Sequence, residues 1–583
     1  MTASPMDTLQ PWIDRAQTLL DASVQALAQR CAAAGRIDSA HADAWQVPSY
    51  ELAWAAAHLM AARSLAASPA VRAAQGTGAT QAPAAATALS PALAPALAPA
   101  LAQLFIIDAL VDVIGRLEAV QLDLDAASTT AQALRDWASD AQWLALRQRG
   151  AGHEALQALG AQVSAAIAAG NDFADPGFSE AVRMASESFA RFGQEQVVPL
   201  AERIHREDLT IPESLLQPLR EMGVFGLSIP QRLGGIAPDD RDDTAMMLAV
   251  TEALSEASLG AAGSLITRPE ILSRALLAGG TDVQKAHWLP RLAAGDPLCA
   301  IAMTEPDHGS DVASLQLRAT RTEAGWQLDG AKTWCTFAGK AGVLMVVART
   351  EADRSLGHRG LSLLLVEKPS TDAHAFDVQQ PGGGRLTGRA IPTIGYRGMH
   401  SYDLSFDRFV VPHDALIGGE AGRGKGFYLT MQGMMGGRIQ TAARACGVMR
   451  AALRAAARYV RDRHVFGQPL ADYPLTQARL ARMAARWMAC RHAAYAVAAL
   501  MDAGGGRMEA SLVKLLACRS AEIVTREALQ LHGGMGYAEE TAVSRYFVDA
   551  RVLSIFEGAE ETLALKVVAR TLLDNALASA PAA

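Results

Sequence analysis

The sequence predicts an α+β protein with several domains, in which helices come first, a β domain follows and a helical region ends the chain. Three observations lead to this class. Apolar residues recur at helical spacing over most of the sequence. Residues 299–412 instead show alternating and β-branched runs separated by Gly and Pro, which is typical of antiparallel strands. The length of 583 residues exceeds what one ordinary core accommodates, so several structural units are expected.

Residues 1–172 predict a helical extension with an irregular middle. Two segments, residues 9–66 and 104–169, carry apolar residues at helical spacing, so each has a face that other residues must cover. Between them, residues 67–103 are dominated by Ala, Pro, Thr and Gly. Because proline lacks an N–H and restricts the residue before it, we expect a linker or long loop here. The two helical segments are expected to pack against one another and against the rest of the protein.

Three further regions follow the extension. Residues 176–298 predict a helical domain, which prolines and a Gly-Gly turn interrupt. Residues 299–412 predict a middle domain built as an antiparallel β-barrel. Residues 413–583 predict a C-terminal helical bundle domain, because apolar residues return to helical spacing there.

The composition excludes some classes of function. Half of the residues are hydrophobic and 19% are charged, which is typical of a folded protein. The net charge of −7 gives no electrostatic footprint for nucleic acid, so we expect no nucleic-acid partner. Six cysteines show no CxxC spacing, which predicts reduced thiols and no metal site. We read no export signal and no apolar run of about 18 residues, so we expect a cytoplasmic protein without a membrane span.

Glu557 is the strongest single candidate for a catalytic residue. It lies in the run Ile555–Glu560, where a carboxylate just after apolar residues is followed by Gly558. A carboxylate in apolar surroundings suits a general base, and the glycine allows close approach of the backbone to a ligand. The ordinary alternative is a surface glutamate at the end of a helix.

Glu557 belongs to a series of ordered blocks between residues 176 and 575. The block before it contains Gln530, Gly533, Gly534, Gly536, Tyr537, Glu540, Arg545 and Asp549. The other blocks are Met303–Asp311, Lys332–Thr336, and Arg463–Gly467 with Gln477 beyond it. Together they resemble the acyl-CoA dehydrogenase family. The resemblance implies a helical domain, a middle β-barrel domain and a C-terminal four-helix bundle, with the N-terminal extension added. His308 departs from the family pattern, and Pro474 replaces a glutamine that is common in relatives.

The resemblance implies oxidation of an acyl-CoA between its α and β carbons. Glu557 would remove the α proton, and FAD would take the β hydrogen as a hydride at flavin N5. The backbone N–H of Glu557 would stabilise charge on the thioester oxygen. Some relatives carry the base just before the arginine that matches Arg438. Gly437 stands at that position here, which leaves Glu557 without a rival.

The resemblance also implies binding residues and partners. FAD in the same subunit would contact Met303, Thr304, Ser310, Trp334 and Thr336. The FAD of a neighbouring subunit would be reached by Arg463, Phe466, Gln477, Gln530, Gly533 and Gly534. A homodimer or a dimer of dimers is therefore expected, with an electron-transferring flavoprotein as acceptor. The acyl-CoA would be bound by Ser310, Thr267, Arg268, Arg438 and Gly558. An ordinary half-buried strand is the alternative for the Trp and Thr residues of 332–336.

Two features indicate one branch of the family. The first is the long N-terminal extension, which most members lack. The second is a set of three stretches similar to the branch that oxidises (2S)-methylsuccinyl-CoA to mesaconyl-CoA in the ethylmalonyl-CoA pathway: Gly263–Ile271, Ile394–Met399 and Arg438–Arg444. A carboxylate on the substrate needs a cationic or multiply donating partner, and Arg268 beside Thr267 is the candidate. A structural ion pair of Arg268 with Glu270 or Glu252 is the alternative.

Other functions stay open at this point. The substrate could be another short or branched acyl-CoA. A flavin oxidase or monooxygenase could share the fold, although a monooxygenase needs no base such as Glu557. A non-enzymatic flavoprotein or a relative that binds nucleic acid is disfavoured by the acidic charge balance.

Overall fold

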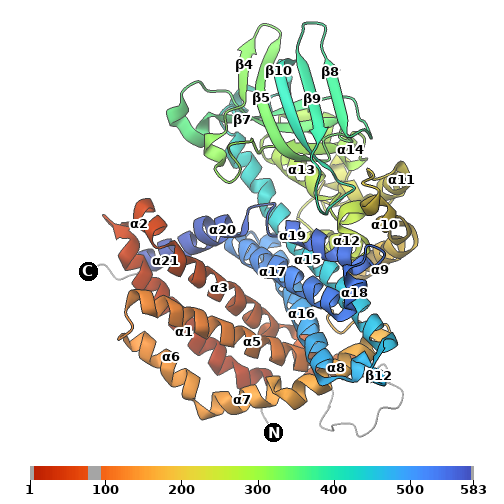
Figure 1. Ribbon diagram of the computed structural model, residues 1–583. Helices are drawn as coiled ribbons and strands as arrows, with labels where there is room; N and C mark the ends of the chain where they lie inside the picture. The colour runs from red at the N-terminus through yellow and green to blue at the C-terminus, as the bar shows by residue number, and fades with distance from the viewer. Residues whose placement is uncertain (1–4, 76–92, 580–583) are drawn as a thin grey trace. The chain divides into compact units, whose positions relative to one another are not determined.

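The computed structural model describes residues 5–75 and 93–579. These residues form two compact units, one from Val182 to Gln440 and one that joins Met1–Ala181 to Thr441–Ala583. Helices precede the β domain and helices follow it, so the predicted α+β class is confirmed. Figure 1 shows the elements of each unit.

The unit of residues 182–440 begins with helices. They are α9 (Glu180–Phe192), α10 (Val198–Arg206), α11 (Glu213–Glu221), α12 (Thr244–Ala257), α13 (Thr267–Gly279) and α14 (Asp282–Ala293), with a π-turn at Leu259–Gly263. Local sequence sets their starts. The Asp243 side chain caps α12, and Thr281 forms a capping box with Gln284 at the start of α14.

The β domain of this unit is one eight-stranded sheet. Its strands are β3 (Cys299–Ala302), β4 (Arg318–Thr322), β5 (Gly325–Thr336), β6 (Val343–Arg349), β7 (Leu361–Glu367), β8 (Ala375–Gln379), β9 (Arg385–Ala390) and β10 (Ser401–Val411). The order is β3-β6-β4-β5-β10-β9-β8, with β7 also paired to β6. The pairs are antiparallel, except that β6 runs parallel to β3 and β4. The middle domain is thus a half-barrel with mixed pairing at one end.

Both faces of β6 are covered, which explains its continuous apolar sequence. Val343, Met345 and Val347 pack in one core with Leu272 of α13 and Leu289 of α14. The alternate residues of the strand pack in a second core inside the sheet, together with the buried ring of Trp326.

The second unit combines the two ends of the chain. Its N-terminal helices are α1 (Pro5–Cys31), α2 (Ser39–Ala44), α3 (Gln46–Ala67), α4 (Pro69–Gln75), α5 (Leu93–Leu124), α6 (Thr129–Ser139), α7 (Ala141–Ala151) and α8 (His153–Ala168). A short hairpin, β1 (Ala32–Ala33) and β2 (Arg36–Ile37), follows α1. Helices α1, α3 and α5 pack together, and α5 also contacts α6, α7 and α8 (Figure 1). The predicted pairing of the two helical segments is therefore confirmed.

The C-terminal part of this unit is also helical. It contains the end of α15 (Gly426–Asp462), then α16 (Pro474–Asp502), α17 (Arg507–His532), α18 (Gly534–Tyr537), α19 (Ala542–Val552), α20 (Glu560–Thr562) and α21 (Arg570–Ser579). A π-helical stretch at Leu563–Ala569 joins the last two. A hairpin, β11 (His464–Val465) and β12 (Gln468–Pro469), separates α15 from α16.

The extension packs on these C-terminal helices. Contacts join α8 and α5 to α16, α3 to α17, and α1 to α21. Helix α8 comes so close to α16 that a Cβ on Gly160 would overlap the carbonyl of Gln477. Two polar contacts also join the extension to α16: the Ser68 hydroxyl lies 3.1 Å from Nδ1 of His492 and is buried, and Arg491 donates to the partly buried Asp172 at 3.0 Å. The expected docking of the extension is confirmed for this unit.

The expected loop at residues 67–103 is partly wrong. Residues 69–75 form α4, and α5 begins at Leu93. Pro95 lies in the first turn of α5, where a missing N–H costs little. Pro99 lies inside the helix, but the buried side chains of Leu97 and Leu101 offset the lost hydrogen bond. The remaining residues of the expected loop, 76–92, lie outside the described part of the chain.

One helix in the described ranges, Leu97–Leu124, is long and apolar enough by composition to cross a membrane. We expected no such segment. Of its most apolar window, 67% is buried inside the protein, where α5 packs against α1, α3 and α16. A helix in the core of a protein can have the same length and apolar composition, and the burial of α5 is that of such a core helix.

Candidate active site

A buried ion pair orders the loop after β3, which carries several predicted cofactor residues. Lys332 on β5 donates to the Glu305 carboxylate and to the Met303 carbonyl, each at 2.8 Å. The same carboxylate accepts the backbone N–H groups of Gln316 and Leu317 at 2.6 and 2.9 Å. Burial lowers the pKa of Lys332, and Glu305 opposes this shift. Because the carboxylate is fully hydrogen-bonded, the pair holds the loop against β5. Ser310 is exposed in this loop.

The end of β5 presents an aromatic ring to solvent. Trp334 has φ 56°, a left-handed backbone, and 56% of its surface is exposed. Such a conformation persists only where the surroundings enforce it, and it is frequent at functional sites. The N–H of Thr333 donates to the Thr304 carbonyl at 2.8 Å, and the Thr336 hydroxyl lies 2.9 Å from that of Ser401. An exposed indole on a strand that also carries Thr336 and is tied to Thr304 fits the flat, polar-edged flavin that the resemblance implies.

Arg268 is a buried cation on the first turn of α13. It is 6% exposed, and it donates to the Ser264 carbonyl at 2.7 Å and to the Tyr396 hydroxyl at 3.2 Å. Both partners are neutral. Among the residues that the structure describes, no carboxylate forms an ion pair with Arg268. The alternative of a structural ion pair with Glu270 or Glu252 is therefore wrong.

Glu270 has other partners. Its carboxylate accepts from Nε of Arg274 at 2.8 Å and from the side-chain amide of Gln440. The Thr267 hydroxyl donates to the same amide group of Gln440 at 2.9 Å. Arg274 also pairs with Asp242 at 3.0 Å, and the two carboxylates raise its pKa against the effect of burial. Thr267, a predicted substrate residue, is thus part of a closed hydrogen-bond network.

Residues from each of the three stretches that indicated the branch meet in this unit. Arg268 contacts Tyr396 of Ile394–Met399, and Thr267 contacts Gln440 of Arg438–Arg444. A Cβ on Gly260 would overlap the Arg397 carbonyl, so the second stretch also lies against the turn before α13. Arg438 itself is half-buried. Residues about 170 positions apart in the sequence therefore build one site around Arg268.

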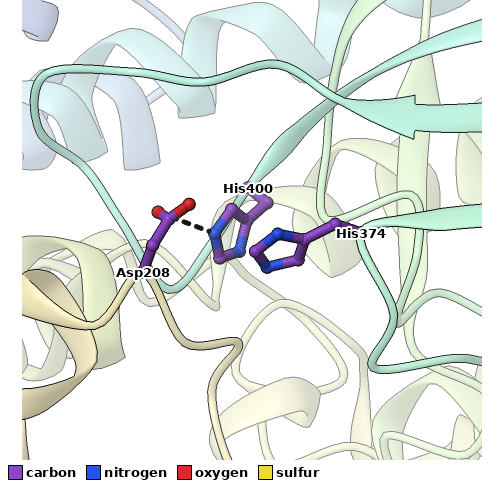
Figure 2. Close-up of side chains that lie close together, drawn as sticks. All are labelled: Asp208, His374 and His400. Atoms are coloured by element: carbon purple, nitrogen blue, oxygen red, sulfur yellow. Dashed lines mark hydrogen bonds and ion pairs between the residues drawn. The ribbon is translucent and has the colours of Figure 1, made fainter.

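A second polar cluster lies at the start of β10, which pairs with the strand β5 that carries Trp334 and Thr336. Asp208, His374 and His400 place potential ligand atoms within 4.8 Å of one another (Figure 2). The Asp208 carboxylate lies 3.1 Å from Nε2 of His400 and 3.5 Å from Nε of Arg397. Burial lowers the pKa of His400, although Asp208 opposes the shift. A cation here would compete with the Arg397 guanidinium, so the contacts favour a hydrogen-bonded staple between two loops.

The predicted base lies in the other unit, between α19 and α20. Glu557 is half-buried and has φ 56°, and Gly558 has φ 99°. A Cβ on Gly558 would come within 2.9 Å of the Leu563 side chain, so both conformation and space require glycine. The Gly558 carbonyl accepts from Nζ of Lys514 at 2.7 Å. Lys514 is fully buried on α17. The buried Lys514 therefore fixes the turn that carries the Glu557 carboxylate.

The surroundings of Glu557 are mixed in polarity. Phe556 is half-buried, and its ring lies 4.7 Å from the guanidinium carbon of Arg444. Arg444 is fully buried and donates to the Thr441 hydroxyl at 2.7 Å. Ile555, in contrast, is exposed. The segment of Glu557 therefore contacts the buried Arg444 guanidinium through Phe556, whereas Ile555 is exposed to solvent.

The residues expected to reach a neighbouring subunit are mostly exposed. Phe466 is 98% exposed with a left-handed backbone, and Arg463, Gln530, Gly533 and Gly534 are exposed as well. The stacked rings of Tyr459 and His532, 4.2 Å apart, bring the ends of α15 and α17 together. A Cβ on Gly533 or Gly534 would meet open space. Gln477 differs, because it is 9% exposed and its Oε1 has no partner in the described chain.

Sequence reasoning missed three residues of these sites. Tyr396 and Gln440 lie inside stretches that had been singled out, but only the structure connects them to Arg268 and Thr267. The sequence did contain a signal for Lys514. This lysine lies at helical spacing with Ser511 and Cys518 on the buried face of α17. Because burial of a charge without a partner is costly, a lysine at such a position predicts a specific acceptor.

Known proteins resemble this chain along most of its length. Family models match at residues 179–296 (acyl-CoA dehydrogenase, N-terminal domain), 300–409 (middle domain) and 424–573 (C-terminal domain). The (2S)-methylsuccinyl-CoA dehydrogenase of Cereibacter sphaeroides is 43% identical over 69% of this chain and 71% of its own. The mitochondrial 2-methylacyl-CoA dehydrogenase of Solanum tuberosum is 33% identical over 67% and 90%.

Solved structures agree. Butyryl-CoA dehydrogenase from Megasphaera elsdenii superposes with a TM-score of 0.62 at 28% identity, and the match covers 68% of this chain and 99% of that one. A glutaryl-CoA dehydrogenase from Mycobacterium smegmatis in complex with FADH2 gives 0.60 at 25% identity over 68% and 95%. The chain therefore belongs to the acyl-CoA dehydrogenase family, and it is an FAD-dependent oxidoreductase that acts on the CH–CH bond of an acyl-CoA.

Proposed function

We propose that this acyl-CoA dehydrogenase oxidises a short, branched dicarboxylic acyl-CoA, namely (2S)-methylsuccinyl-CoA to mesaconyl-CoA. The observation that carries the proposal is the buried Arg268, which has neutral partners and no protein carboxylate in the described residues. A buried charge is stable only when it is paired, and a substrate carboxylate would supply the missing partner. The similarity to a (2S)-methylsuccinyl-CoA dehydrogenase supports the same substrate.

Arg268 and its neighbours would select the substrate by charge. The guanidinium is already oriented by Ser264 and Tyr396, so little conformational freedom is lost when a carboxylate binds. A substrate without that carboxylate would leave the cation unpaired in a desolvated site. Discrimination by an unpaired buried polar group is much stronger than discrimination by one methylene.

Glu557 would act as the general base for the α proton, with its carboxylate held on the turn that Lys514 fixes. When bound, FAD supplies the hydride acceptor for the β hydrogen. Met303, Thr304, Ser310, Trp334 and Thr336 would hold the flavin, and Gly558 and Arg438 would contact the thioester substrate. The backbone N–H of Glu557 would donate to the thioester carbonyl and stabilise the charge that develops there.

The partners follow from the same reasoning. We propose a homodimer or a dimer of dimers, in which Arg463, Phe466, Gln477, Gln530, Gly533 and Gly534 reach the FAD of the neighbouring subunit. The exposure of Phe466 supports this role, because a fully exposed aromatic side chain gains by burial against a partner. An electron-transferring flavoprotein would reoxidise the flavin, and the reaction would serve the ethylmalonyl-CoA pathway in the cytoplasm.

A panel of CoA thioesters with an artificial electron acceptor tests the substrate. We expect kcat/KM for (2S)-methylsuccinyl-CoA to exceed the values for butyryl-CoA and isobutyryl-CoA. Equal or higher values for the monocarboxylic substrates would contradict the proposal and indicate another short or branched acyl-CoA. Oxygen consumption in the same assay separates a dehydrogenase from an oxidase or monooxygenase.

A further inference from the structure

The segment that carries Glu557 is held at three points by buried or half-buried contacts. At its start, the Ser554 hydroxyl donates to Glu522 of α17. In its middle, Lys514 of α17 donates to the Gly558 carbonyl. At its end, the Glu560 backbone N–H donates to the Ser554 carbonyl at 3.1 Å and closes the loop. Residues 554–560 therefore form a closed loop with Glu557 in its middle and Glu560 at its end.

Glu560 is a buried carboxylate with partners from two different regions. It is 5% exposed. Arg519 of α17 pairs with both of its oxygens, and the Tyr50 hydroxyl of α3 donates to Oε1 at 2.5 Å. Tyr50 belongs to the N-terminal extension, 510 positions away in the sequence. A phenol that donates to a buried carboxylate forms a short, strong hydrogen bond.

The extension also fixes the two donors. The Trp54 ring, one turn after Tyr50 on α3, lies 5.2 Å from the guanidinium carbon of Arg519. The guanidinium carbon of Arg116 on α5 also lies 5.6 Å from the centroid of the Trp54 ring, and Arg116 pairs with Glu51 and Asp112. Burial, and then Glu560, raise the pKa of Tyr50, so the phenol remains a donor at neutral pH. The donors are thus held by residues of α3 and α5.

We propose that the N-terminal extension acts on the chemical step by holding the loop that carries Glu557, with Tyr50 as a positioning residue that works through Glu560. The left-handed backbone of Glu557 makes the carboxylate sensitive to this hold, because a strained conformation persists only while its surroundings enforce it. A displacement of a catalytic group by 1 Å costs up to about 10²-fold in rate. The inference rests on Glu557 as the base.

The test is Tyr50→Phe, which keeps the ring and removes the donor. In stopped-flow reduction by saturating acyl-CoA, we expect the rate of flavin reduction to fall by about tenfold. FAD content, substrate Kd and Tm should stay close to those of the wild type. With α-deuterated substrate the isotope effect on reduction should be at least as large as in the wild type, because proton removal is the step that slows.

Two matched variants isolate the contact. Asp108→Asn removes an exposed ion pair with Arg482 that also joins the extension to the C-terminal helices but does not touch the loop, so reduction should stay within about twofold of the wild type. Glu560→Gln weakens the acceptor, so Tyr50→Phe should have a smaller effect in that background than in the wild type.

The outcomes separate this inference from the proposed function. If Glu557→Gln reduces the flavin normally, the assignment of the base fails and this inference fails with it. If Glu557→Gln is inactive but Tyr50→Phe reduces at the wild-type rate, only the positioning role is wrong. Loss of FAD or a lower Tm in Tyr50→Phe that accounts for the lower activity would also overturn it, because the contact would then be structural.

Discussion

The two units of this protein place their functional residues in different ways. The unit of residues 182–440 is continuous in sequence, and the contacts that fix its site residues, such as Thr304 with Thr333 and Arg268 with Tyr396, all lie inside that one stretch. The other unit joins both ends of the chain, and the loop with Glu557 depends on Tyr50, which precedes it by about 500 residues. The residues of the first site lie within the three domains that the family models match. The second has gained a support from outside the three matched domains.

The largest expected effect comes from the base itself. Glu557→Gln keeps the shape of the side chain and removes its charge, so FAD and acyl-CoA should still bind while flavin reduction falls by about 10²–10⁴-fold. Stopped-flow absorbance at the flavin band measures this rate. Glu561→Gln is a matched control, because Glu561 is exposed and close in sequence. Near-normal flavin reduction in Glu557→Gln would show that Glu557 is not the base. The comparison between the two units would then no longer hold.

A smaller and selective effect is expected in the other unit. Arg268→Met should reduce kcat/KM for (2S)-methylsuccinyl-CoA on the order of 10²-fold, because the substrate carboxylate would be buried without a partner. The value for butyryl-CoA should change much less. Arg268→Lys should lie between, since the ammonium keeps the charge but not the planar set of donors. Equal losses for both substrates would show that Arg268 is structural.

The smallest effect concerns stability where the two chain ends meet. Burial, and then Arg491, lower the pKa of His492 to about 4 from an ordinary 6.5, although Asp175 and Asp172 oppose the shift. The folded state thus keeps His492 neutral, whereas the unfolded state binds a proton below about pH 6.5. Stability is full above that pH and falls as the pH drops towards 4, by about 1.4 kcal/mol per unit.

Thermal unfolding at pH 7.5 and pH 5 measures this loss. His492→Gln should lose less stability than the wild type between the two values, by about 2 kcal/mol. Other buried histidines contribute equally to both proteins, so the difference isolates His492. The same pH dependence in both proteins would contradict the prediction.

Much of the fold could be predicted from the sequence, because helical spacing and strand alternation are local signals. The helices of 9–66 and 104–169 and the β-rich texture of 299–412 appear in the structure. The start of α5 was missed, because proline is a strong local signal against helix, while the burial of Leu97 and Leu101 depends on helices far away. Tertiary packing outweighed the local preference there.

The candidate site divides in the same way. Arg268 was found because its residue type suits a carboxylate and its stretch resembles one branch of the family. Tyr396, Gln440 and Tyr50 could not be assigned, because each acts through contacts to residues that are distant in the sequence, and such contacts leave no periodic pattern. A sequence names residue types that suit a reaction, but long-range pairs of this kind emerge only from the folded chain.

The close approach of α8 to α16 at Gly160 has a consequence for folding during synthesis of the protein. Helices α1 to α8 leave the ribosome first, yet the surfaces that cover them belong to α16, α17 and α21. At an ordinary rate of synthesis, the roughly 300 intervening residues take about 15 to 60 seconds to be made. During that time the apolar face of α5 has only its neighbours in the extension for cover. Over that interval a nascent chain of this topology exposes apolar surface that α16, α17 and α21 later cover, which favours aggregation.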